Sequence, residues 1–377
     1  MNPLHIIYAV SVLMDFAVCG VNFAITRRAA ELGASAFQVS MLSGGFFATY
    51  ILGALILGHL AERWNPRRSA VAGAVVTLLG SIVCALTTNL PVLVATVAAM
   101  GFSWGAFWPP LMAWLSEGAN GGALSRRLAR FSIAWNLGAL LGFGVTGKLF
   151  KLHPHLAFAI TIAAAVLIVG LLLLPMQPMP RETLPADHEP VPHGRGFRIN
   201  GWLANFGVTV LIGATTALMP KLATQLNIPA DQHGGLLALS RGMALVGFWT
   251  LQHLHYWRRR LWPLWLTQTA AALAALLFVT GTRVWEFAIA SAVIGAASGY
   301  SYLASIYFTL EETAAKTRGS GFHEAILGSA FFLGPLVAGI VADVISLPAA
   351  FLTVAVLVPA LVGIQIALTI RRRRATR

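Results

Sequence analysis

The sequence predicts an all-α integral membrane protein with twelve transmembrane helices, arranged as two six-helix halves that repeat in parallel. The composition is the first observation behind this fold class. Of the 377 residues, 57% are hydrophobic and only 10% are charged, whereas a soluble domain carries about 25% charged residues. This composition excludes a large globular enzyme. The other two observations are a series of long apolar segments and an internal repeat of glycines and charges.

The apolar segments give the individual helices in order. A hydrocarbon core of about 30 Å needs roughly 20 apolar residues per helix. Twelve stretches meet that length, at residues 4–25, 37–60, 69–88, 91–115, 128–149, 156–175, 198–219, 235–256, 262–281, 285–308, 322–342 and 347–370. Most connections between them are short, so consecutive helices are expected to be antiparallel neighbours.

One long polar break divides this series into two sets of six helices. It is rich in proline and charge, which is typical of a flexible cytoplasmic linker. The expected organisation is therefore an N-terminal six-helix half at 1–175, a linker at 176–197 and a C-terminal six-helix half with a basic cytoplasmic tail at 198–377.

The repeat joins the two halves. Gly101, Gly105 and Glu117 recur 194 residues later as Gly295, Gly299 and Glu311, while Arg67, Arg68, Gly142 and Gly147 recur 192 residues later as Arg259, Arg260, Gly334 and Gly339. A polytopic protein built from two parallel repeats usually holds its working site where the repeats meet. The repeat therefore predicts transport, with a central cavity between the halves.

The charge distribution predicts the orientation. The net charge is +13, and with the N-terminus inside only six of the 26 Lys and Arg residues lie outside. Those six are Arg27, Arg28, Lys148, Lys151, Lys221 and Arg283. This positive-inside bias places both termini in the cytoplasm of a cell-membrane protein. The tail at 371–374 is expected to contact anionic lipid headgroups, so nucleic acid is not an expected partner.

Cofactor and enzyme chemistry find no support in the sequence. Cys19 and Cys84 fall inside predicted helices and give no disulfide signal. His253 and His255 have no acidic or cysteine partners at a zinc-like spacing. We expect no metal, no cofactor and no enzymatic activity, because the helices offer no clustered nucleophile, base or metal ligands.

A loop motif carries a family resemblance. The loop between the second and third helices contains Gly58, Glu62, Arg63, Arg67 and Arg68. It resembles the Gly-x-x-x-Asp-Arg-x-Gly-Arg-Arg loop of the major facilitator superfamily. Glu62 replaces the aspartate, Asn65 the turn glycine and Pro66 a basic residue. Asparagine tolerates the left-handed conformation better than most residues, so the turn can survive.

The resemblance implies a cytoplasmic gate formed by Gly58, Glu62, Arg63, Arg67, Arg68 and Glu117. Glu62 would lie near the N-terminus of helix eleven, where a helix dipole favours an anion. Arg63 would pair with Glu117 at the end of helix four. The alternative is a positively charged inner turn with no gating role.

Glycine-rich helices extend the resemblance over essentially the whole chain. Helix four has small residues or a proline every four positions from Gly101 to Ala113, followed by Glu117 at the next such position. This spacing places the small residues on one face and allows close helix contact. Helices five and eleven carry similar glycines. Val97 stands where the drug–proton antiporter branch often has arginine, which argues against that branch.

Asp15 is the strongest candidate for proton coupling. A charge inside the bilayer costs at least about 2.5 kcal/mol, so an ionisable side chain placed there is a candidate functional residue. It lies near the middle of helix one. Tyr8, Ser11, Cys19 and Asn22 share its helical face. Such a stripe is expected to line a water-filled cavity, where the carboxylate can bind and release a proton. The alternative is a structural carboxylate bonded to neighbouring helices.

Arg241 is the strongest candidate for substrate binding. It is placed in helix eight, roughly seven residues from the outer end, with no acidic neighbour in that helix. A guanidinium there needs an anion, either from substrate or from Asp15 across the cavity. The alternative is that it snorkels toward the outer headgroups.

Other candidates are weaker. His323 and Glu324 at the start of helix eleven form a candidate proton relay, or Glu324 stabilises the helix N-terminus. Polar and aromatic side chains that can bind a solute, or simply pack against protein and lipid, are Trp104, Trp108, Trp135, Asn136, Asn205, Tyr300, Tyr302 and Tyr307.

These observations predict a monomeric secondary transporter that moves a small organic solute by alternating access, coupled to protons or another ion. Arg241 favours an anionic or zwitterionic solute, and the aromatic residues favour one with apolar surface. Two alternatives remain open: a non-transporting receptor or scaffold on the same fold, and a lipid-handling protein. The sequence indicates neither the direction of transport nor the identity of the solute.

Overall fold

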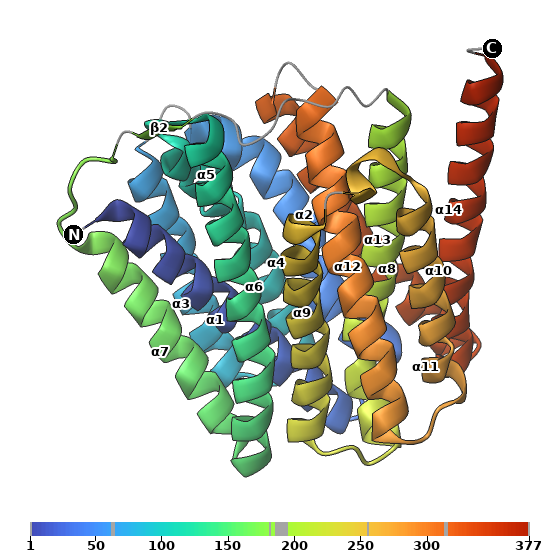
Figure 1. Ribbon diagram of the computed structural model, residues 1–377. Coiled ribbons are helices and arrows are strands. Elements are labelled where there is room, and N and C mark those ends of the chain that lie inside the picture. The colour runs from blue at the N-terminus through green and yellow to red at the C-terminus, as the bar shows by residue number, and fades with distance from the viewer. Residues whose placement is uncertain are drawn as a thin grey trace. The chain divides into compact units, whose positions relative to one another are not determined.

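The computed structural model describes residues 2–61, 65–180, 182–184, 195–254, 256–312 and 316–375, and it is almost entirely helical (Figure 1). Its helices are α1 (Pro3–Glu31), α2 (Ala36–Ala61), α3 (Pro66–Leu86), α4 (Leu90–Trp104), α5 (Trp108–Ser116), α6 (Gly121–Leu152), α7 (Pro154–Leu173), α8 (Arg195–Gln225), α9 (Ala230–His253), η1 (Tyr256–Arg259), α10 (Trp262–Ala275), α11 (Leu277–Thr280), α12 (Val284–Glu312), α13 (Lys316–Val344) and α14 (Leu347–Ala375). Twelve segments of the described chain are long and apolar enough to cross a membrane. The predicted all-α fold with twelve membrane helices is confirmed.

Asn-Pro pairs define where α1 and α3 begin. Asn65 precedes Pro66 and has φ −63° and ψ 122°, and its side-chain oxygen accepts a hydrogen bond from the Arg67 N–H at 3.0 Å. The expected left-handed turn at Asn65 is therefore wrong. The cause is local: a residue before proline is driven into the extended region, where asparagine acts as an N-cap.

The fourth predicted helix is broken, which corrects the expectation of one regular helix from Gly101 to Glu117. It consists of α4 and α5, with turns at 105–107 between them. Pro109 and Pro110 begin α5 and have no N–H to bond the carbonyls of the preceding turn. The two pieces still form one membrane-crossing segment, Leu90–Ser116.

The polar linker contains an element that the sequence did not reveal. Strand β2 (Glu182–Leu184) pairs in parallel with β1 (Ala119–Asn120), which follows α5. The expectation of a wholly flexible linker is wrong over these residues. The rest of the linker from 185 to 194 lies outside the described residues.

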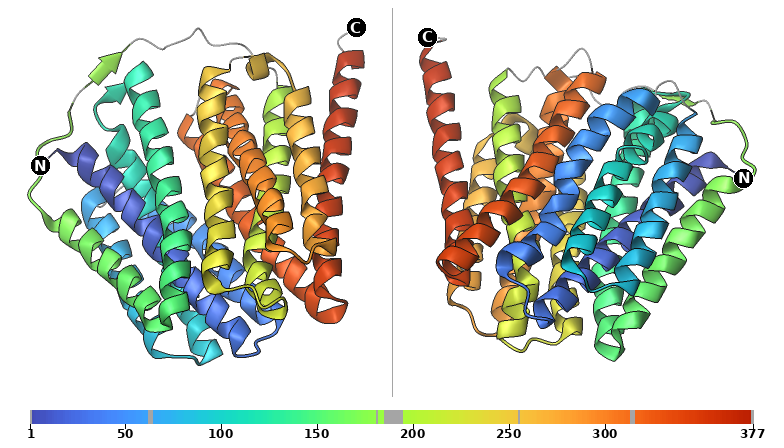
Figure 2. Two further views of the ribbon diagram at one scale, coloured as in Figure 1. Left: turned by 60° about the horizontal axis from the view of Figure 1, so that its bottom comes forward. Right: turned by 180° about the vertical axis from the view of Figure 1, so that it is seen from behind.

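The chain folds into two compact units. Unit 1 comprises Met1–Gly33, Gly45–Glu189 and Pro229–Ala238, and unit 2 comprises Ala34–Gly44, Pro190–Ile228 and Leu239–Arg377. In unit 1, α1 begins and α7 ends at the same end of the bundle; in unit 2, α8 begins and α14 ends at the same end (Figures 1 and 2). The first turns of α2 belong to unit 2, while the rest of that helix belongs to unit 1. The first turns of α9 belong to unit 1, while the rest of that helix belongs to unit 2. The predicted division into 1–175 and 198–377 stays a prediction.

The repeated glycines make equivalent contacts in both units. In unit 1, a Cβ added to Gly105 would clash with the backbone of Gly53 on α2. In unit 2, a Cβ added to Gly299 would clash with the Ala244 carbonyl oxygen on α9. The predicted close helix contact is confirmed for these glycines, and each unit relies on it to pack its helices backbone against backbone.

A pair of amides links α10 to α14 inside unit 2. Gln268 Nε2 donates to Gln365 Oε1 at 3.1 Å, and Gln365 Nε2 donates to Gln268 Oε1 at 2.9 Å. Both side chains are completely buried. Buried amides must be bonded at membrane depth, so this pair sets how the two helices pair.

Candidate functional site

Asp15 lies where the sequence places it, in the middle of α1. It is 12 residues beyond Pro3, or about 18 Å along the helix axis. Its side chain is only 7% exposed. Gly138 and Gly142 of α6 hold α1 close, because a Cβ on either would crowd the backbone of Val12 or Phe16. The close packing of a glycine-rich helix therefore buries the carboxylate.

The polar stripe around Asp15 is uneven in its exposure. Ser11 is fully buried and its hydroxyl donates to the Ile7 carbonyl oxygen at 2.7 Å. Tyr8, Cys19 and Asn22 are partly exposed. The middle of this face, at Ser11 and Asp15, is therefore buried, and the residues at its two ends are partly exposed.

Arg241 lies farther from the start of its helix than the sequence predicts. Helix α9 begins at Ala230 and not near 235, so Arg241 is 11 residues from its start, or about 16 Å along the axis. The difference arises because Asp231, Gln232 and His233 are polar and yet helical. Its guanidinium carbon lies 5.9 Å from the centroid of the Phe331 ring, within the range of a cation–π contact.

No described carboxylate within unit 2 forms an ion pair with Arg241. At this depth a lone guanidinium favours an anion. Asp15 belongs to unit 1, and the expected pairing of Asp15 with Arg241 stays a prediction.

His323 and Glu324 occupy the start of the membrane-crossing part of α13. His323 is fully buried, and its Nδ1 lies 3.0 Å from the Ser305 hydroxyl of α12. Its Nε2 has no hydrogen-bond partner among the described residues. The Tyr302 ring stands edge-on at 5.0 Å, and Glu324 is partly buried. The structure therefore gives the His323 ring one bonded nitrogen and one unsatisfied nitrogen.

The aromatic candidates of unit 1 pack against one another. Trp104 and Trp108 stand edge to face at 5.6 Å, with Phe46 against Trp104 and Phe131 against Trp108. Both indoles are at least nine-tenths buried. This arrangement is what packing requires. The Trp104 Nε1 has no hydrogen-bond partner in the described chain and is a buried donor that could bind a solute.

Two further candidates lie on α6. Trp135 is partly buried. Asn136 is 1% exposed, and its Nδ2 donates to the Ser132 carbonyl oxygen at 3.1 Å. The amide of Asn136 is thereby bonded within its own helix.

In unit 2, Tyr300 and Tyr307 pack against buried Trp257, with ring centroids 6.1 and 5.2 Å apart. Asn205 on α8 is 1% exposed; its oxygen accepts from Thr209 at 3.4 Å, while its Nδ2 has no partner in the described chain. Asn205 therefore offers a buried donor, whereas the two tyrosine rings serve a packed cluster.

The candidate cytoplasmic gate is only partly described. Glu62 and Arg63 lie outside the described residues, and Gly58 lies in α2. Arg67 donates from Nε and Nη2 to the carbonyl oxygens of Leu172 and Leu174, both at 2.6 Å. Arg67 thus caps the C-terminal end of α7 within its own unit.

The two remaining gate candidates are exposed. These are Arg68 and Glu117. The backbone oxygen of Glu117 accepts a hydrogen bond from Arg127 Nη1 at 3.0 Å. Whether either side chain takes part in a gate stays a prediction.

Arg28 and Arg127 are structural residues that the sequence analysis did not identify. Arg28 Nη2 bonds the carbonyl oxygens of Cys84 and Thr87 at the end of α3, each at 2.6 Å. Arg127 is 3% exposed and bonds the carbonyl oxygen of Pro180 at 2.7 Å. The bonds from Arg28 to Cys84 and from Arg127 to Pro180 span 56 and 53 residues, so the sequence showed each arginine only as a charge beside an apolar segment.

Among the described residues, no group of three His, Cys, Asp or Glu side chains could hold a metal ion. The described chain offers a buried carboxylate on α1, a guanidinium on α9, a histidine on α13 and unsatisfied N–H donors. Such groups bind a proton or a polar solute.

Curated relatives match parts of the chain. The probable hexose phosphate transport protein of Chlamydia muridarum is 27% identical over 104 residues, covering 26% of this chain and 23% of that protein. The arabinose-proton symporter of Escherichia coli (strain K12) is 28% identical over 162 residues, covering 42% of this chain and 32% of that protein. Both alignments span less than a third of the relative's own length.

Solved structures match almost the whole chain. A bacterial homologue of the human lysosomal transporter Spinster, in an inward-facing and occupied conformation, has a TM-score of 0.77 at 12% identity, covering 97% of this chain and 96% of that one. A POT family transporter in complex with 5-aminolevulinic acid also has a TM-score of 0.77 at 12% identity, covering 98% and 96%. At these identities the likeness shows the fold alone.

The family model gives the decisive match. The model of the Major Facilitator Superfamily matches residues 4–313, and the motif resemblance had indicated the same family. With its twelve apolar helices, the chain is a multi-pass membrane protein and belongs to the Major Facilitator Superfamily.

Proposed function

We propose that this protein is a secondary active transporter of the cell membrane, which moves a small organic solute by alternating access and couples that movement to protons. One observation carries the coupling: Asp15, a carboxylate 7% exposed in the middle of a membrane helix. An ionised carboxylate at that depth is costly, so a cycle that protonates and deprotonates it links proton uptake to conformational change.

The coupling step needs only one proton. When solvent reaches α1, the ionised Asp15 takes a proton from water and becomes neutral, which removes the cost of burying a charge. When the protein opens to the other side, the proton returns to water there. His323 and Glu324 are a second candidate pair for proton handling, supported by the unsatisfied Nε2 of His323.

Arg241 supports an anionic or zwitterionic solute. It lies about 16 Å along α9 and has no ion-pair partner among the described carboxylates of its unit. A carboxylate or phosphate would satisfy the guanidinium with two parallel hydrogen bonds. The names of similar proteins include a hexose phosphate transporter and a complex with 5-aminolevulinic acid, and both compounds carry an anionic group. The N–H donor of Asn205, which belongs to the same unit as Arg241, would add a polar contact.

Orientation follows from charge. The excess of Lys and Arg in the loops assigned to the cytoplasm supports an orientation with both termini inside and with the basic end of α14 at the headgroups. A non-transporting receptor and a lipid-handling protein on the same fold remain the alternatives, and they predict no flux of a soluble compound.

Purified protein in liposomes that enclose a pH-sensitive dye tests the proposal. Organic acids, amino acids, sugar phosphates, nucleosides and amphipathic cations are added in turn outside. We expect an anionic or zwitterionic compound to change the internal pH. The change should be lost in Arg241→Gln and partly restored in Arg241→Lys, which keeps the positive charge. Absence of both proton movement and radiolabelled flux across the panel would contradict transport.

A further inference from the structure

The first turns of α9 pack against α1 and α6 in a contact that we call the α6–α9 junction, formed by residues 143–151 and 230–238. Lys151 Nζ and Asp231 Oδ2 are 2.9 Å apart. A Cβ on Gly147 would lie 2.8 Å from the Gly234 Cα, so the two backbones touch. All of these residues belong to unit 1.

His233 lies in this junction with its hydrogen-bonding capacity unused. The side chain is completely buried, and neither ring nitrogen has a hydrogen-bond partner in the described part of the chain. The Phe23 ring packs on it at 4.7 Å. Leaving a buried polar group unsatisfied costs about 1–3 kcal/mol, and native proteins rarely tolerate it without a reason.

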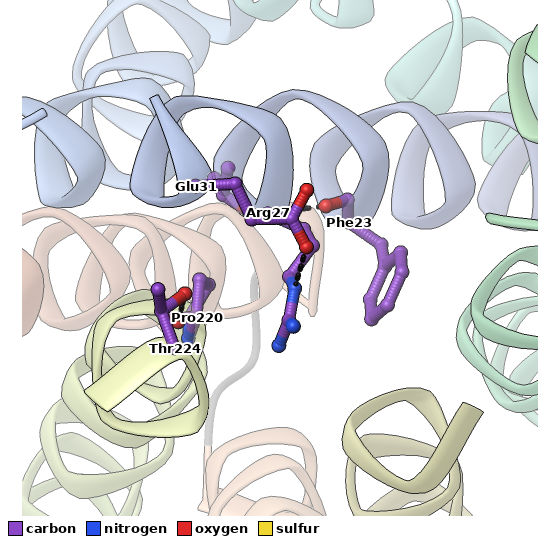
Figure 3. Close-up of polar contacts among 6 residues, drawn as sticks. Phe23, Arg27, Glu31, Pro220 and Thr224 are labelled. Atoms are coloured by element: carbon purple, nitrogen blue, oxygen red, sulfur yellow. Dashed lines mark hydrogen bonds and ion pairs between the residues drawn. The ribbon is translucent and has the colours of Figure 1, made fainter. Parts of the chain in front are cut away.

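Arg27 is a cation on α1, four residues after Phe23. It is 7% exposed, and its Nε bonds Glu31 Oε1 at 2.6 Å. Its Nη1 is buried and has no partner among the described residues. Figure 3 shows the Phe23 and Arg27 side chains leaving α1 on the same side. Neither ring nitrogen of His233 has a hydrogen-bond acceptor in the described chain, and the Arg27 guanidinium lies close enough to act on the ring electrostatically.

The internal repeat supplies a matched site without the histidine. In unit 2, residues 36–44 at the start of α2 contact the end of α13, where a Cβ on Gly339 would lie 2.9 Å from the Phe37 Cα. Asp343, 192 residues after Lys151, accepts hydrogen bonds from the N–H groups of Ala36 and Phe37 at 2.8 and 3.0 Å. The two junctions are therefore built alike.

The residue that corresponds to His233 in the second junction is Val39, 194 positions earlier and also completely buried. A small apolar side chain thus suffices for packing at this position. An imidazole adds polar groups that the packing does not need, which indicates a role other than packing.

We propose that His233 is a proton-binding site that controls opening of the α6–α9 junction, an inference that rests on the proposed proton-coupled transport. In the closed junction a protonated ring would be a second cation near Arg27, without an acceptor. When the junction opens, the ring meets water and can accept a proton at a ring nitrogen. Proton uptake therefore favours the open junction, and return of the proton to water lets it close.

Other charged groups lie on the elements packed around His233. They are Arg27 and Glu31 on α1, Lys148 and Lys151 on α6, and Asp231 on α9 itself. A test must separate them from His233. Replacing His233 with valine, the residue of the matched junction, leaves all five in place.

Distance measurement between two spin labels provides the test. Cysteines replace the exposed residues Leu152 and Gln232 in the 377-residue chain, with Cys19 and Cys84 changed to serine, and the labelled protein is studied in lipid nanodiscs from pH 5 to pH 8. The variants are His233→Val and, if valine impairs folding, His233→Gln. The control is His155→Gln, which removes an exposed histidine of the same unit.

We expect the long-distance population to grow as the pH falls. Because a solvated imidazole titrates near pH 6.5, the ratio of open to closed junction should rise by up to about tenfold per pH unit below that point. The response should vanish in His233→Val and His233→Gln and persist in His155→Gln. Populations that do not change with pH, or an unchanged response in both His233 variants, would overturn the proposal.

The outcome is separable from that of the transport assay. The labels report the junction without any solute. Solute-driven proton flux in liposomes together with a pH-independent junction would remove this inference and leave the proposed function standing. A His233-dependent junction in a protein that carries no solute would remove the proposed function.

Discussion

The buried amide pair between α10 and α14 predicts an unequal response to two similar substitutions. In Gln268→Leu, both the Nε2 and the Oε1 of Gln365 lose their partner. In Gln365→Leu, only the Oε1 of Gln268 is left alone, because its Nε2 still donates to the Leu264 carbonyl oxygen at 2.9 Å. One substitution thus leaves two orphaned groups and the other leaves one.

The magnitudes follow from counting those groups. With about 1 kcal/mol for each unsatisfied group, Gln268→Leu should lower the free energy of unfolding by about 2 kcal/mol and Gln365→Leu by about 1 kcal/mol. The double variant leaves neither amide and replaces both with leucines of similar volume. It should cost less than about 1 kcal/mol, so the two effects should fall short of additivity by about 2 kcal/mol.

Reversible unfolding in mixed lipid–SDS micelles, followed by circular dichroism, measures all four proteins. Two results would refute the reasoning. One is a double variant whose destabilisation equals the sum of the single ones. The other is a larger loss for Gln365→Leu than for Gln268→Leu, which would contradict the bond to Leu264.

Three further predictions concern packing, capping and binding. Gly101→Val should lower the unfolding free energy by about 1–3 kcal/mol, because a Cβ would clash with the α2 backbone. Gly45→Ala, where a Cβ meets nothing within 4 Å, should raise the unfolding free energy by about 0.5–1 kcal/mol. Equal effects of the two variants in the same unfolding assay would contradict the close contact. Arg28→Gln should lower it by about 1–3 kcal/mol through loss of two carbonyl bonds, while Arg68→Gln, at an exposed position, should be neutral; a neutral Arg28→Gln would rule out the cap. Arg241→Gln should weaken binding of an identified anionic solute at least tenfold by calorimetry, and unchanged affinity would remove Arg241 from the binding site.

The sequence predicts the fold because the bilayer imposes a simple rule. Each helix must be long enough and apolar enough to cross, and that rule predicts twelve segments whose ends lie within six residues of those observed. The repeated glycines were also informative. Gly105 and Gly299 have no side chain where helices touch. The spacing in the sequence already placed Gly105 on the same helical face as Gly101.

Local chemistry accounts for the errors. The Pro109-Pro110 pair breaks the fourth helix, although its hydropathy is continuous. Pro66 turns Asn65 into an N-cap instead of a left-handed turn. The polar residues at the start of α9 hid its beginning at Ala230, so Arg241 lies farther from the start of the helix than predicted. In each case a one-dimensional hydropathy pattern could not resolve the cause.

The candidate site was less predictable than the fold. The burial of Asp15 followed from its place in an apolar helix, but the neighbours that bury it lie on α6, 123 or more positions away in the sequence. The unsatisfied nitrogens of His233 depend on contacts that α9 makes with α1. Arg28 was expected only as an outer-loop charge and Arg67 as a gate residue, yet each bonds distant carbonyl oxygens at a helix end. Such pairings require the tertiary structure.

Solute-driven proton movement in liposomes, compared between the wild type and Asp15→Asn, tests the central claim most directly. Asparagine keeps the size and polarity of the side chain but cannot exchange a proton. Glu286→Gln, which changes a partly exposed carboxylate at the start of α12, is the matched control. The account predicts that Asp15→Asn abolishes the proton signal while Glu286→Gln retains it. A full proton signal in Asp15→Asn would contradict the claim that this carboxylate couples protons to transport.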